Sequence, residues 1–379
     1  MEDISIYIHI PFCTSKCHYC DFASFPGKFH LVEDYIKSLI IELDSYKDRL
    51  KNYKVRTIFI GGGTPSAIDG KYIYRILEHI QKNFNIHRQM EVSLEANPKT
   101  LDGEKLKIYR EAGINRISLG LQTLNDGILK KLGRSHDKKD FFHSYDLLEA
   151  VGFENINVDL IFNLPDQTLE DGIKDVTSLV QLGIKHISYY SLIIEPNTPI
   201  YNWYHDGKIK LLDEDDERRL YHQVRAYLRE KGYNHYEISN FAYNGYECKH
   251  NLVYWKVKPY IGLGLASHSY FNNRRFSNTT DLKEYIQTLS SNSLPIVEEE
   301  YIDKKLEIAE YCILGLRLIR GIDKREFTDR FKFNIKDIYG EIIEKHKKNG
   351  LVVEDERTLR LSDKGLDLAN LVEVDFLPD

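Results

Sequence analysis

The chain has 379 residues, of which 42% are apolar and 29% are charged, and its formal net charge is −6. This length and composition suit one large core with an appended domain, and a negative chain without a dense Lys/Arg tract does not suit a nucleic-acid partner. No signal-peptide pattern starts the sequence, and no apolar run approaches the ~18 residues of a membrane span. We therefore expect a cytoplasmic protein with no membrane span.

Three cysteines stand out near the N-terminus. An alternating strand is predicted at residues 4–10, and the loop after it reads P-F-C-T-S-K-C-H-Y-C-D-F, which gives Cys13, Cys17 and Cys20 a C-x3-C-x2-C spacing. A cubane iron–sulfur cluster is usually held by four thiolates, so three would leave one iron open to a ligand. The amine and carboxylate of S-adenosylmethionine (SAM) can chelate that iron. One electron from the cluster would then release methionine and a 5′-deoxyadenosyl radical.

Other interpretations of the cysteines stay open. A zinc site usually needs a fourth Cys or His at short spacing, and a tight loop would turn His18 away from the three thiols. Three unconnected thiols are a further alternative. The total of five cysteines is odd, which argues for a reducing compartment rather than a disulfide framework. Cys248 and Cys312 stand alone, and we expect both to be structural.

Short apolar runs alternate with amphipathic stretches over the first half of the chain. After residues 4–10, strands are predicted at 57–60, 91–95, 116–119, 156–162 and 186–192. Helices are predicted at 31–46, 70–83, 102–112, 125–132, 138–150 and 168–181. Strands that alternate with helices imply parallel pairing and right-handed crossovers. A barrel or part-barrel of this kind places its chemistry at the C-terminal ends of its strands.

Polar motifs follow these strand ends. G-G-G-T-P-S at residues 61–66 follows the second strand. Consecutive glycines allow close approach to a ligand and supply amide donors, although a tight strand–helix turn is the plainer alternative. Glu95 ends the third strand, Gln122 follows the fourth and Asp159 lies within the fifth. A carboxylate in an apolar strand is costly unless it is paired or bonded, so both acids are candidates for ligand binding or structural hydrogen bonding.

Together these motifs resemble the radical SAM family. The resemblance rests on Y-I-H-I-P-F-C-x3-C-x2-C, G-G-G-T-P-S, L-E-A-N-P, G-I-N-R-I-S-L-G-L-Q-T and L-G-R-S-H, and runs from about residue 4 to the C-terminus. It implies a partial (β/α)6 TIM-like barrel, a [4Fe-4S] cluster on Cys13, Cys17 and Cys20, and SAM on the open iron, with no catalytic residue assigned. The implied SAM contacts are Tyr7, Tyr19, Gly62, Gly63, Thr64, Glu95, Gln122, Arg134 and Asp159.

Within that family, the chain resembles the branch that contains oxygen-independent coproporphyrinogen III oxidase and heme chaperones of the HemW type. Phe22 stands where the oxidase has a further cysteine, and only twelve residues precede Cys13, whereas the oxidase has a longer N-terminal segment. Residues 249–255 read K-H-N-L-V-Y-W and match the H-N-x-x-Y-W motif of the chaperones. The implied heme contacts are His250, Asn251, Tyr254 and Trp255.

The chemistry of this motif suits heme. Imidazole is a common axial heme ligand, and aromatic rings supply flat apolar contact, although a histidine beside aromatics is structural in many proteins. His235 and His268 are the next candidate ligands. Two enzymes remain as alternatives: the oxidase, which performs radical oxidative decarboxylation in porphyrin biosynthesis, and a radical SAM enzyme that acts on another substrate.

The last part of the chain has a different pattern. A linker is predicted at residues 289–295, helices at 303–318 and 338–348, and a two-stranded wing at 351–353 and 359–361. These elements resemble a winged-helix-like α+β domain. DNA binding is therefore an alternative, but the second helix mixes charges and the tail is acidic, whereas phosphate recognition needs concentrated positive charge.

The sequence thus predicts three regions: a radical SAM core at 1–235, a flanking region with the heme motif at 236–300, and a winged-helix-like domain at 301–379. The predicted function is that of a heme-binding, heme-delivering chaperone that carries a [4Fe-4S] cluster and SAM. Its expected partners are heme and a heme-accepting protein. Nothing in the sequence specifies that acceptor, an oligomeric state or cleavage of SAM in turnover.

Overall fold

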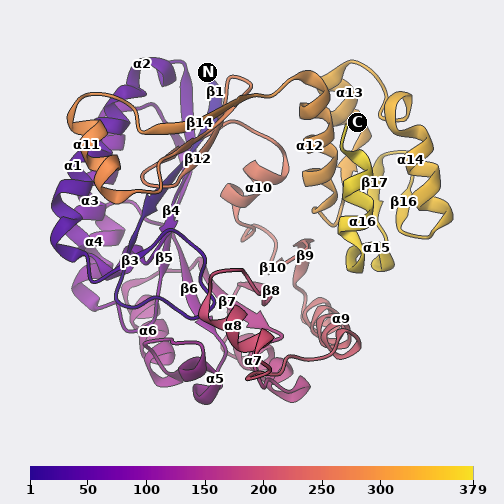
Figure 1. The fold of residues 1–379 in the computed structure, drawn as a ribbon, viewed down its shortest axis with the longest axis horizontal. Helices are drawn as coiled ribbons and strands as arrows, with labels where there is room; N and C mark the ends of the chain where they lie inside the picture. Colours follow the sequence, from indigo (N-terminus) through magenta and orange to yellow (C-terminus); the bar gives the residue numbers. More distant parts are fainter. Residues whose placement is uncertain (379) are drawn as a thin grey trace.

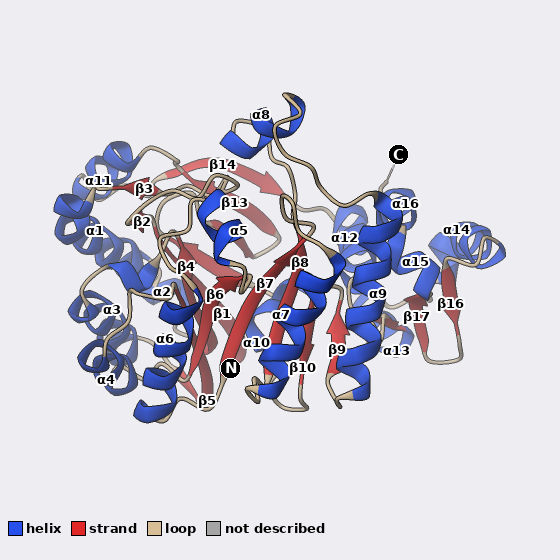
Figure 2. Cartoon of the chain, turned by 90° about the horizontal axis from the view of Figure 1, so that it is seen from below, coloured by secondary structure: helices blue, strands red, loops and turns tan. Residues whose placement is uncertain are grey.

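A curved, open sheet forms the body of the protein in a computed structural model that describes residues 1–378 (Figure 1). In sheet order its twelve strands are β14 (Ile296–Tyr301), β13 (Arg274–Asn278), β12 (His268–Phe271), β11 (Tyr260–Leu263), β1 (Glu2–Ile10), β4 (Tyr53–Gly62), β5 (Ile86–Ala96), β6 (Arg116–Gln122), β7 (Ile156–Phe162), β8 (His186–Ser191), β10 (Asn240–Ala242) and β9 (Asn234–Glu237). The strands from β11 to β8 run parallel, and the others pair antiparallel. The two end strands do not meet, so the barrel is partial (Figure 2).

Eleven helices of residues 1–378 belong to the body, and several of them cover the outer face of this sheet (Figure 1). They are α1 (Val32–Ser45), α2 (Lys47–Leu50), α3 (Gly70–Asn83), α4 (Gly103–Glu111), α5 (Asp126–Lys131), α6 (Lys138–Val151), α7 (Leu169–Gln181), α8 (Pro199–His205), α9 (Glu214–Glu230), α10 (Lys249–Trp255) and α11 (Leu282–Ser290). Near the cysteines lie the strand pair β2 (Phe12–Cys13) and β3 (Phe25–Pro26) and the 3-10 turns η1 (Phe29–Leu31) and η2 (Pro65–Ala67). In Figure 1, α1, α3, α4 and α6 follow the outer face, whereas α10 lies between the sheet and the C-terminal unit.

Local sequence explains these elements. β6 is buried along its whole length, as expected for a parallel strand that is covered on both faces. In α3, Ile73, Ile76, Leu77 and Ile80 are buried at helical spacing, and the Asp69 side chain caps the first turn. The outer helices therefore bury one apolar stripe each and leave the inner face of the sheet for the site.

The predicted strands and helices of the first half are confirmed as β1, β4 to β8, α1 and α3 to α7, with some ends shifted. The sheet extends further than predicted, because β11 pairs with β1 and short strands lengthen both edges. These added strands have three to six residues, too few for a reliable periodicity. The linker predicted at residues 289–295 is wrong, since this segment joins α11 to β14 within the body. The boundaries at 235 and 300 stay a prediction.

A buried carboxylate ties the added strands to the first half of the chain. Glu42 of α1 is fully buried and accepts hydrogen bonds from Gly264 N–H at 2.8 Å, Asn278 Nδ2 at 2.6 Å and Tyr285 O–H at 2.5 Å. Burial raises the pKa of Glu42 to about 7, even though the three donors favour its charged form. One side chain thus fastens the segment that carries β11 to β13 and α11.

The C-terminal unit has its own apolar core, in which Cys312 is buried. It consists of α12 (Lys304–Leu316), α13 (Lys324–Phe331), α14 (Lys336–Lys348), α15 (Asp363–Asp367), α16 (Ala369–Glu373), the 3-10 turn η3 (Val374–Phe376), β15 (Ile322–Asp323), β16 (Val352–Glu354) and β17 (Thr358–Leu361). The predicted helices and wing are present, and β15 adds a third strand to the wing. None of the helices in residues 1–378 combines the length and hydropathy needed to cross a membrane.

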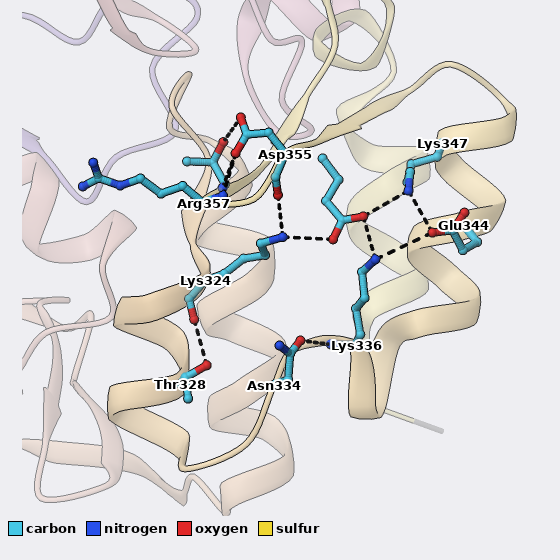
Figure 3. A network of polar contacts seen from close by, with 10 residues as sticks. Lys324, Thr328, Asn334, Lys336, Glu344, Lys347, Asp355 and Arg357 are labelled. Atoms are coloured by element: carbon cyan, nitrogen blue, oxygen red, sulfur yellow. Dashed lines mark hydrogen bonds and ion pairs between the residues drawn. The ribbon is translucent and has the colours of Figure 1, made fainter.

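A second buried carboxylate holds the wing against its helices. Glu354 lies 3.2 Å from Lys324 Nζ, 2.9 Å from Lys336 Nζ and 3.0 Å from Lys347 Nζ. Figure 3 shows these three lysines converging from α13 and α14. Burial alone would raise the pKa of Glu354, but the three ammonium groups outweigh it and lower the pKa to about 2. These lysines therefore form internal ion pairs rather than a positive face for phosphates.

We expect Glu42 to make stability depend on pH. Its folded pKa of about 7 lies above the ordinary value of 4.5, so its contribution is fully present below about pH 4.5 and is lost as pH rises through 7. Between pH 5 and pH 8, the free energy of unfolding should fall by about 2–3 kcal/mol more in the wild type than in Glu42→Gln. Urea denaturation at both pH values measures this difference.

The matched control is Glu356→Gln, which changes an exposed glutamate in the C-terminal wing. It should keep the pH dependence of the wild type. Parallel pH profiles for the wild type and Glu42→Gln would contradict the assignment of this titration to Glu42.

Candidate functional site

A cavity of about 660 Å³ lies between the inner face of the sheet and α10. Because side chains alternate along a strand, β6 points Arg116, Ser118 and Gln122 into it, and β7 points Asn157 and Asp159 into it. The structure brings nearly all predicted contacts to this one cavity. They are Tyr7, Cys13, Cys17, Tyr19, Cys20, Gly62, Gly63, Thr64, Glu95, Gln122, Arg134, Asp159, His250, Asn251 and Tyr254.

The cysteine loop forms one wall of the cavity. Cys13 is buried, Cys17 and Cys20 are partly buried, and all three are free thiols. Thr64 Oγ1 donates to Cys13 Sγ and Arg134 Nη1 donates to Cys17 Sγ, both at 3.5 Å. Burial raises the pKa of Cys13 and of Cys20, so iron has to displace their protons. Donors beside the sulfur atoms favour the thiolate forms that a cluster needs.

His18 points away from the thiols, as predicted. Its Nδ1 lies 2.9 Å from the Lys131 carbonyl oxygen, and its ring packs edge-on against Trp203 at 4.8 Å. Within residues 1–378, no three His, Cys, Asp or Glu side chains gather closely enough to surround one metal ion. A zinc ion needs such a gathering, with ligands at ~2.0–2.3 Å, whereas a four-iron cluster takes each thiolate on a separate iron. The donor set therefore fits a cluster better than zinc.

The glycine loop, residues 61–66, is shaped by its closeness to the cysteine strand, residues 10–13, which leads into the cysteine loop. Gly63 N–H donates to Ile10 O and Thr64 N–H donates to Phe12 O, both at 2.9 Å. A Cβ on Gly63 would lie 2.9 Å from the same two oxygens. The prediction that this loop offers free amides to a ligand is therefore wrong for Gly63 and Thr64, because these amides already bind the cysteine strand. The loop lines the cavity by close backbone approach instead.

Three predicted polar residues come from neighbouring strands: Glu95 near the end of β5, Gln122 at the end of β6 and Asp159 in the middle of β7. Glu95 accepts a hydrogen bond from Gly62 N–H at 3.1 Å, and burial, with the nearby Asp159 charge, raises its pKa to about 8. Asp159 accepts a hydrogen bond from the Ser118 hydroxyl at 3.0 Å. Gln122 has a φ of +72° and follows a bulge in β6, which turns its side chain into the cavity.

Arg134 connects the cysteine loop to these strand ends. Its Nη2 donates to Asn97 Oδ1 and to Gly120 O, both at 2.7 Å. Asn97 Nδ2 also donates to Thr64 Oγ1 at 3.1 Å. Asn97 therefore joins two predicted site residues, although it is not among the predicted contacts. Its place in L-E-A-N-P is the sequence feature that points to it.

Tyr7 and Tyr19 line the same end of the cavity, and burial raises the pKa of both phenols. The Tyr7 hydroxyl lies 3.1 Å from His9 Nδ1, and His9 Nε2 lies 2.8 Å from Ala23 O. His9 thus links β1 to Ala23, in the segment that follows the cysteine loop. Both tyrosines are neutral at physiological pH and offer hydroxyl groups to a ligand.

The predicted heme motif lies on α10. His250 and Tyr254 are one helical turn apart, and His250 Nε2 lies 2.8 Å from the Tyr254 hydroxyl. His250 Nδ1 lies 2.7 Å from Thr57 Oγ1, while Thr57 donates its own proton to Ser5 Oγ at 2.8 Å. Burial lowers the pKa of His250 to about 3, so its ring is neutral. Asn251 reaches the cavity beside it.

Trp255 does not join these residues. It comes five residues after His250, which places it on another side of the helix. There the Arg317 guanidinium lies 4.7 Å from its ring centroid. The two alternative histidines also lie outside the cavity lining: His235 stacks on Phe241 at 4.2 Å, and His268 is exposed.

Two buried charged residues beneath α10 are missing from the sequence predictions. Glu91 accepts hydrogen bonds from His250 N–H at 3.0 Å and Lys249 N–H at 3.1 Å. It thereby satisfies free amides at the start of α10. Arg116 is 1% exposed and lines the cavity. Glu91 lies in the middle of β5 and Arg116 begins β6, and only their inward alternation with Ser93 and Ser118 indicates a role in the interior.

Comparison with known proteins assigns the family. Residues 7–179 match the model of the radical SAM superfamily, and residues 302–368 match the HemN C-terminal domain. The chain is 38% identical to the heme chaperone HemW of Lactococcus lactis subsp. lactis (strain IL1403), over 99% of this chain and 97% of that protein. It is 36% identical to the heme chaperone HemW of Bacillus subtilis (strain 168), over 98% and 99%. The chain belongs to the HemW family of the radical SAM superfamily.

A solved structure establishes the fold. Coproporphyrinogen III oxidase (HemN) from Escherichia coli, a radical SAM enzyme, matches with a TM-score of 0.86 at 22% identity, over 99% of this chain and 90% of that chain. The predicted fold class, a partial (β/α)6 TIM-like barrel with a C-terminal winged-helix-like domain, is confirmed. Membership of the superfamily also implies a [4Fe-4S] cluster and SAM.

We expect the three loop cysteines alone to determine iron binding. Protein reconstituted under anaerobic conditions should hold about four irons per chain, and Ala at Cys13, Cys17 or Cys20 should abolish this. Cys248→Ala and Cys312→Ala are the matched controls, because Cys248 lines the cavity at the start of α10 and Cys312 is buried in the C-terminal core. Iron and sulfide assays measure the outcome. Loss of iron in Cys248→Ala, or stoichiometric zinc in the purified wild type, would contradict the prediction.

We expect Glu95→Gln to weaken SAM binding and leave the iron content unchanged. Loss of a charge-assisted hydrogen bond costs about 1.5–3 kcal/mol, or roughly ten- to a hundredfold in affinity. Titration calorimetry on the reconstituted protein measures the change, with the exposed Glu104→Gln as the control. Arg134→Ala is a less selective test, because Arg134 also donates to Cys17. Unchanged affinity in Glu95→Gln would remove this residue from the site.

Proposed function

We propose that this protein binds heme and delivers it to an acceptor protein in the cytoplasm, on a radical SAM scaffold that holds a [4Fe-4S] cluster and SAM. Relatives named heme chaperone HemW support this proposal, since they match nearly the whole chain. The observation that carries it is the state of His250. This histidine is neutral, fixed by neighbours and placed on the cavity wall.

The residues at the cysteine end of the cavity fit the cluster and SAM. Cys13, Cys17 and Cys20 would hold the cluster, whose open iron would bind the amine and carboxylate of SAM. The Arg134 guanidinium can bond a carboxylate, and the remaining predicted contacts would surround the rest of the cofactor. They are Tyr7, Tyr19, Gly62, Gly63, Thr64, Glu95, Gln122 and Asp159. Glu95 can accept from a cationic group, which would favour its charged form against a pKa of about 8.

A hydrogen-bond chain sets the tautomer of His250. Because the Thr57 hydroxyl donates to Ser5, its oxygen accepts the proton of His250 Nδ1. Nε2 is then the unprotonated nitrogen and accepts from the Tyr254 hydroxyl. A neutral imidazole with a free nitrogen lone pair is the form that binds iron. The pKa of about 3 keeps His250 in this form at any physiological pH.

Tyr254 covers the nitrogen that heme iron would take. A heme ligand on His250 Nε2 therefore has to replace the hydrogen bond from the Tyr254 hydroxyl at 2.8 Å. A neutral hydrogen bond contributes about 0.5–1.5 kcal/mol, which is small beside a coordination bond. Asn251 and Tyr254 lie on the same wall and would contact the bound macrocycle, whereas Trp255 packs on Arg317 instead.

Coproporphyrinogen III oxidase remains less well supported as a function. The match to its structure is at 22% identity and concerns the fold. Phe22, which stands where the oxidase has a cysteine, is 63% exposed at the rim of the cavity. The curated relatives with 32–38% identity are named as heme chaperones. We therefore propose heme delivery rather than decarboxylation.

Heme titration of the wild type and His250→Ala tests the proposal. We expect a Soret shift in the wild type and its loss in the variant, with iron content and SAM affinity retained as evidence of folding. His268→Ala, at an exposed histidine outside the cavity lining, is the matched control and should bind heme normally. The wild type with SAM and reductant should not decarboxylate coproporphyrinogen III.

Two outcomes would overturn this function. Heme binding unaffected by His250→Ala would place the ligand elsewhere. Robust protoporphyrinogen production would replace the chaperone with the oxidase.

A further inference from the structure

Arg116 is a buried cation without a hydrogen-bond partner. Its side chain is 1% exposed, its Nε has no partner, and the guanidinium makes no hydrogen bond with any residue from 1 to 378. A guanidinium is always charged and carries five N–H donors. Burial of such a group is unfavourable unless an anion or several acceptors meet it. The structure thus leaves the donors of Arg116 available.

The acids nearest to Arg116 are already engaged. Glu91 accepts hydrogen bonds from His250 N–H and Lys249 N–H. Asp159 accepts hydrogen bonds from Ser118 Oγ at 3.0 Å and Asn157 Nδ2 at 2.8 Å. Neither carboxylate bonds to Arg116, although both lie close enough to favour its charge. Their negative charge stabilises the cation, and its N–H groups remain unused.

Arg116 points into the cavity at the end far from the cysteines. Arg116, Ser118 and Gln122 share the inner face of β6, and all three line the cavity. Gln122 lies at the cysteine end, and six residues of strand place Arg116 ~20 Å away from it. Arg134, at the cysteine end, already donates to Asn97 and Gly120. The cavity therefore has a bonded arginine near the cluster loop and an unbonded arginine beneath α10.

Arg116 lies on the same side of the cavity as His250. It pairs with Ser93 in the register of β5 and β6. Glu91, two residues before Ser93 on the same face of β5, accepts the His250 N–H. The guanidinium thus lies under the start of the helix that presents His250 Nε2.

We propose that Arg116 binds a carboxylate of the ligand that occupies the cavity under α10. Resting on the function proposed above, this carboxylate is a propionate of heme. A guanidinium can bond both oxygens of a carboxylate with parallel N–H groups. Iron at His250 and a propionate at Arg116 would hold the macrocycle at two points and fix its orientation. A porphyrin without free carboxylates would be held only through its iron at His250.

Paired ligands test this proposal. Heme and heme dimethyl ester, in which both propionates are esterified, are titrated into the reconstituted wild type, Arg116→Gln and the control Arg88→Gln, at an exposed arginine of β5. We expect the wild type and Arg88→Gln to bind heme at least about tenfold more tightly than the ester. Arg116→Gln should bind both ligands with similar affinity and keep the Soret shift of the His250 complex.

The outcomes separate this proposal from the function on which it rests. A wild type that binds neither ligand contradicts heme binding itself. A wild type that binds heme and its ester equally overturns the role of Arg116 alone, and this comparison needs no variant. Equal loss of both ligands in Arg116→Gln, with the cluster intact, would show that Arg116 only supports α10. If Arg116→Gln does not fold, Arg116→Lys replaces it and should lose part of the preference for free propionates.

Discussion

The site depends on charged groups held in the interior, on the inner face of the sheet. Each such group needs partners, because desolvation opposes its charged form. Asp159 and Arg134 have several, from Ser118, Asn97 and the strand backbone. Glu95 has only the Gly62 amide, and its pKa rises to about 8. Charged groups with few hydrogen-bond partners are stabilised most when a ligand supplies further partners. Glu95 and Arg116 are such groups, and both line the cavity.

Helix α10 shows how such charges also build the structure. Glu91 satisfies amides at its start, and the Thr57 hydroxyl fixes the ring of His250. The helix is short and lies between β4 and α12, so packing on both sides holds it in place. A residue on its inner side is therefore held in one orientation before any ligand arrives, which lowers the entropic cost of binding.

Much of the fold and of the site follows from the sequence. Strands β1 and β4 to β8 are predictable because long apolar runs alternate with amphipathic helices, and the cysteine spacing identifies the loop. Strand β11 could not be predicted, because it has only four residues and they pair with β1, some 250 positions earlier in the chain. Arg116 and Glu91 escape prediction for a similar reason, since only the folded chain brings them together beneath α10. Trp255 is misplaced because adjacency in sequence is not adjacency on a helix.

Strand β4 has a consequence for how the two ends of the cavity relate. At one point it carries Thr57, which bonds to His250, and at its end it carries Gly61 and Gly62, which pair with the end of β1 just before the cysteine loop. Five residues of extended chain separate Thr57 from Gly62, or ~17 Å. The strand sets a fixed distance between the two halves of the cavity. An inserted or deleted residue here would turn one set of side chains to the opposite face. We therefore expect this strand to tolerate substitutions better than changes in length.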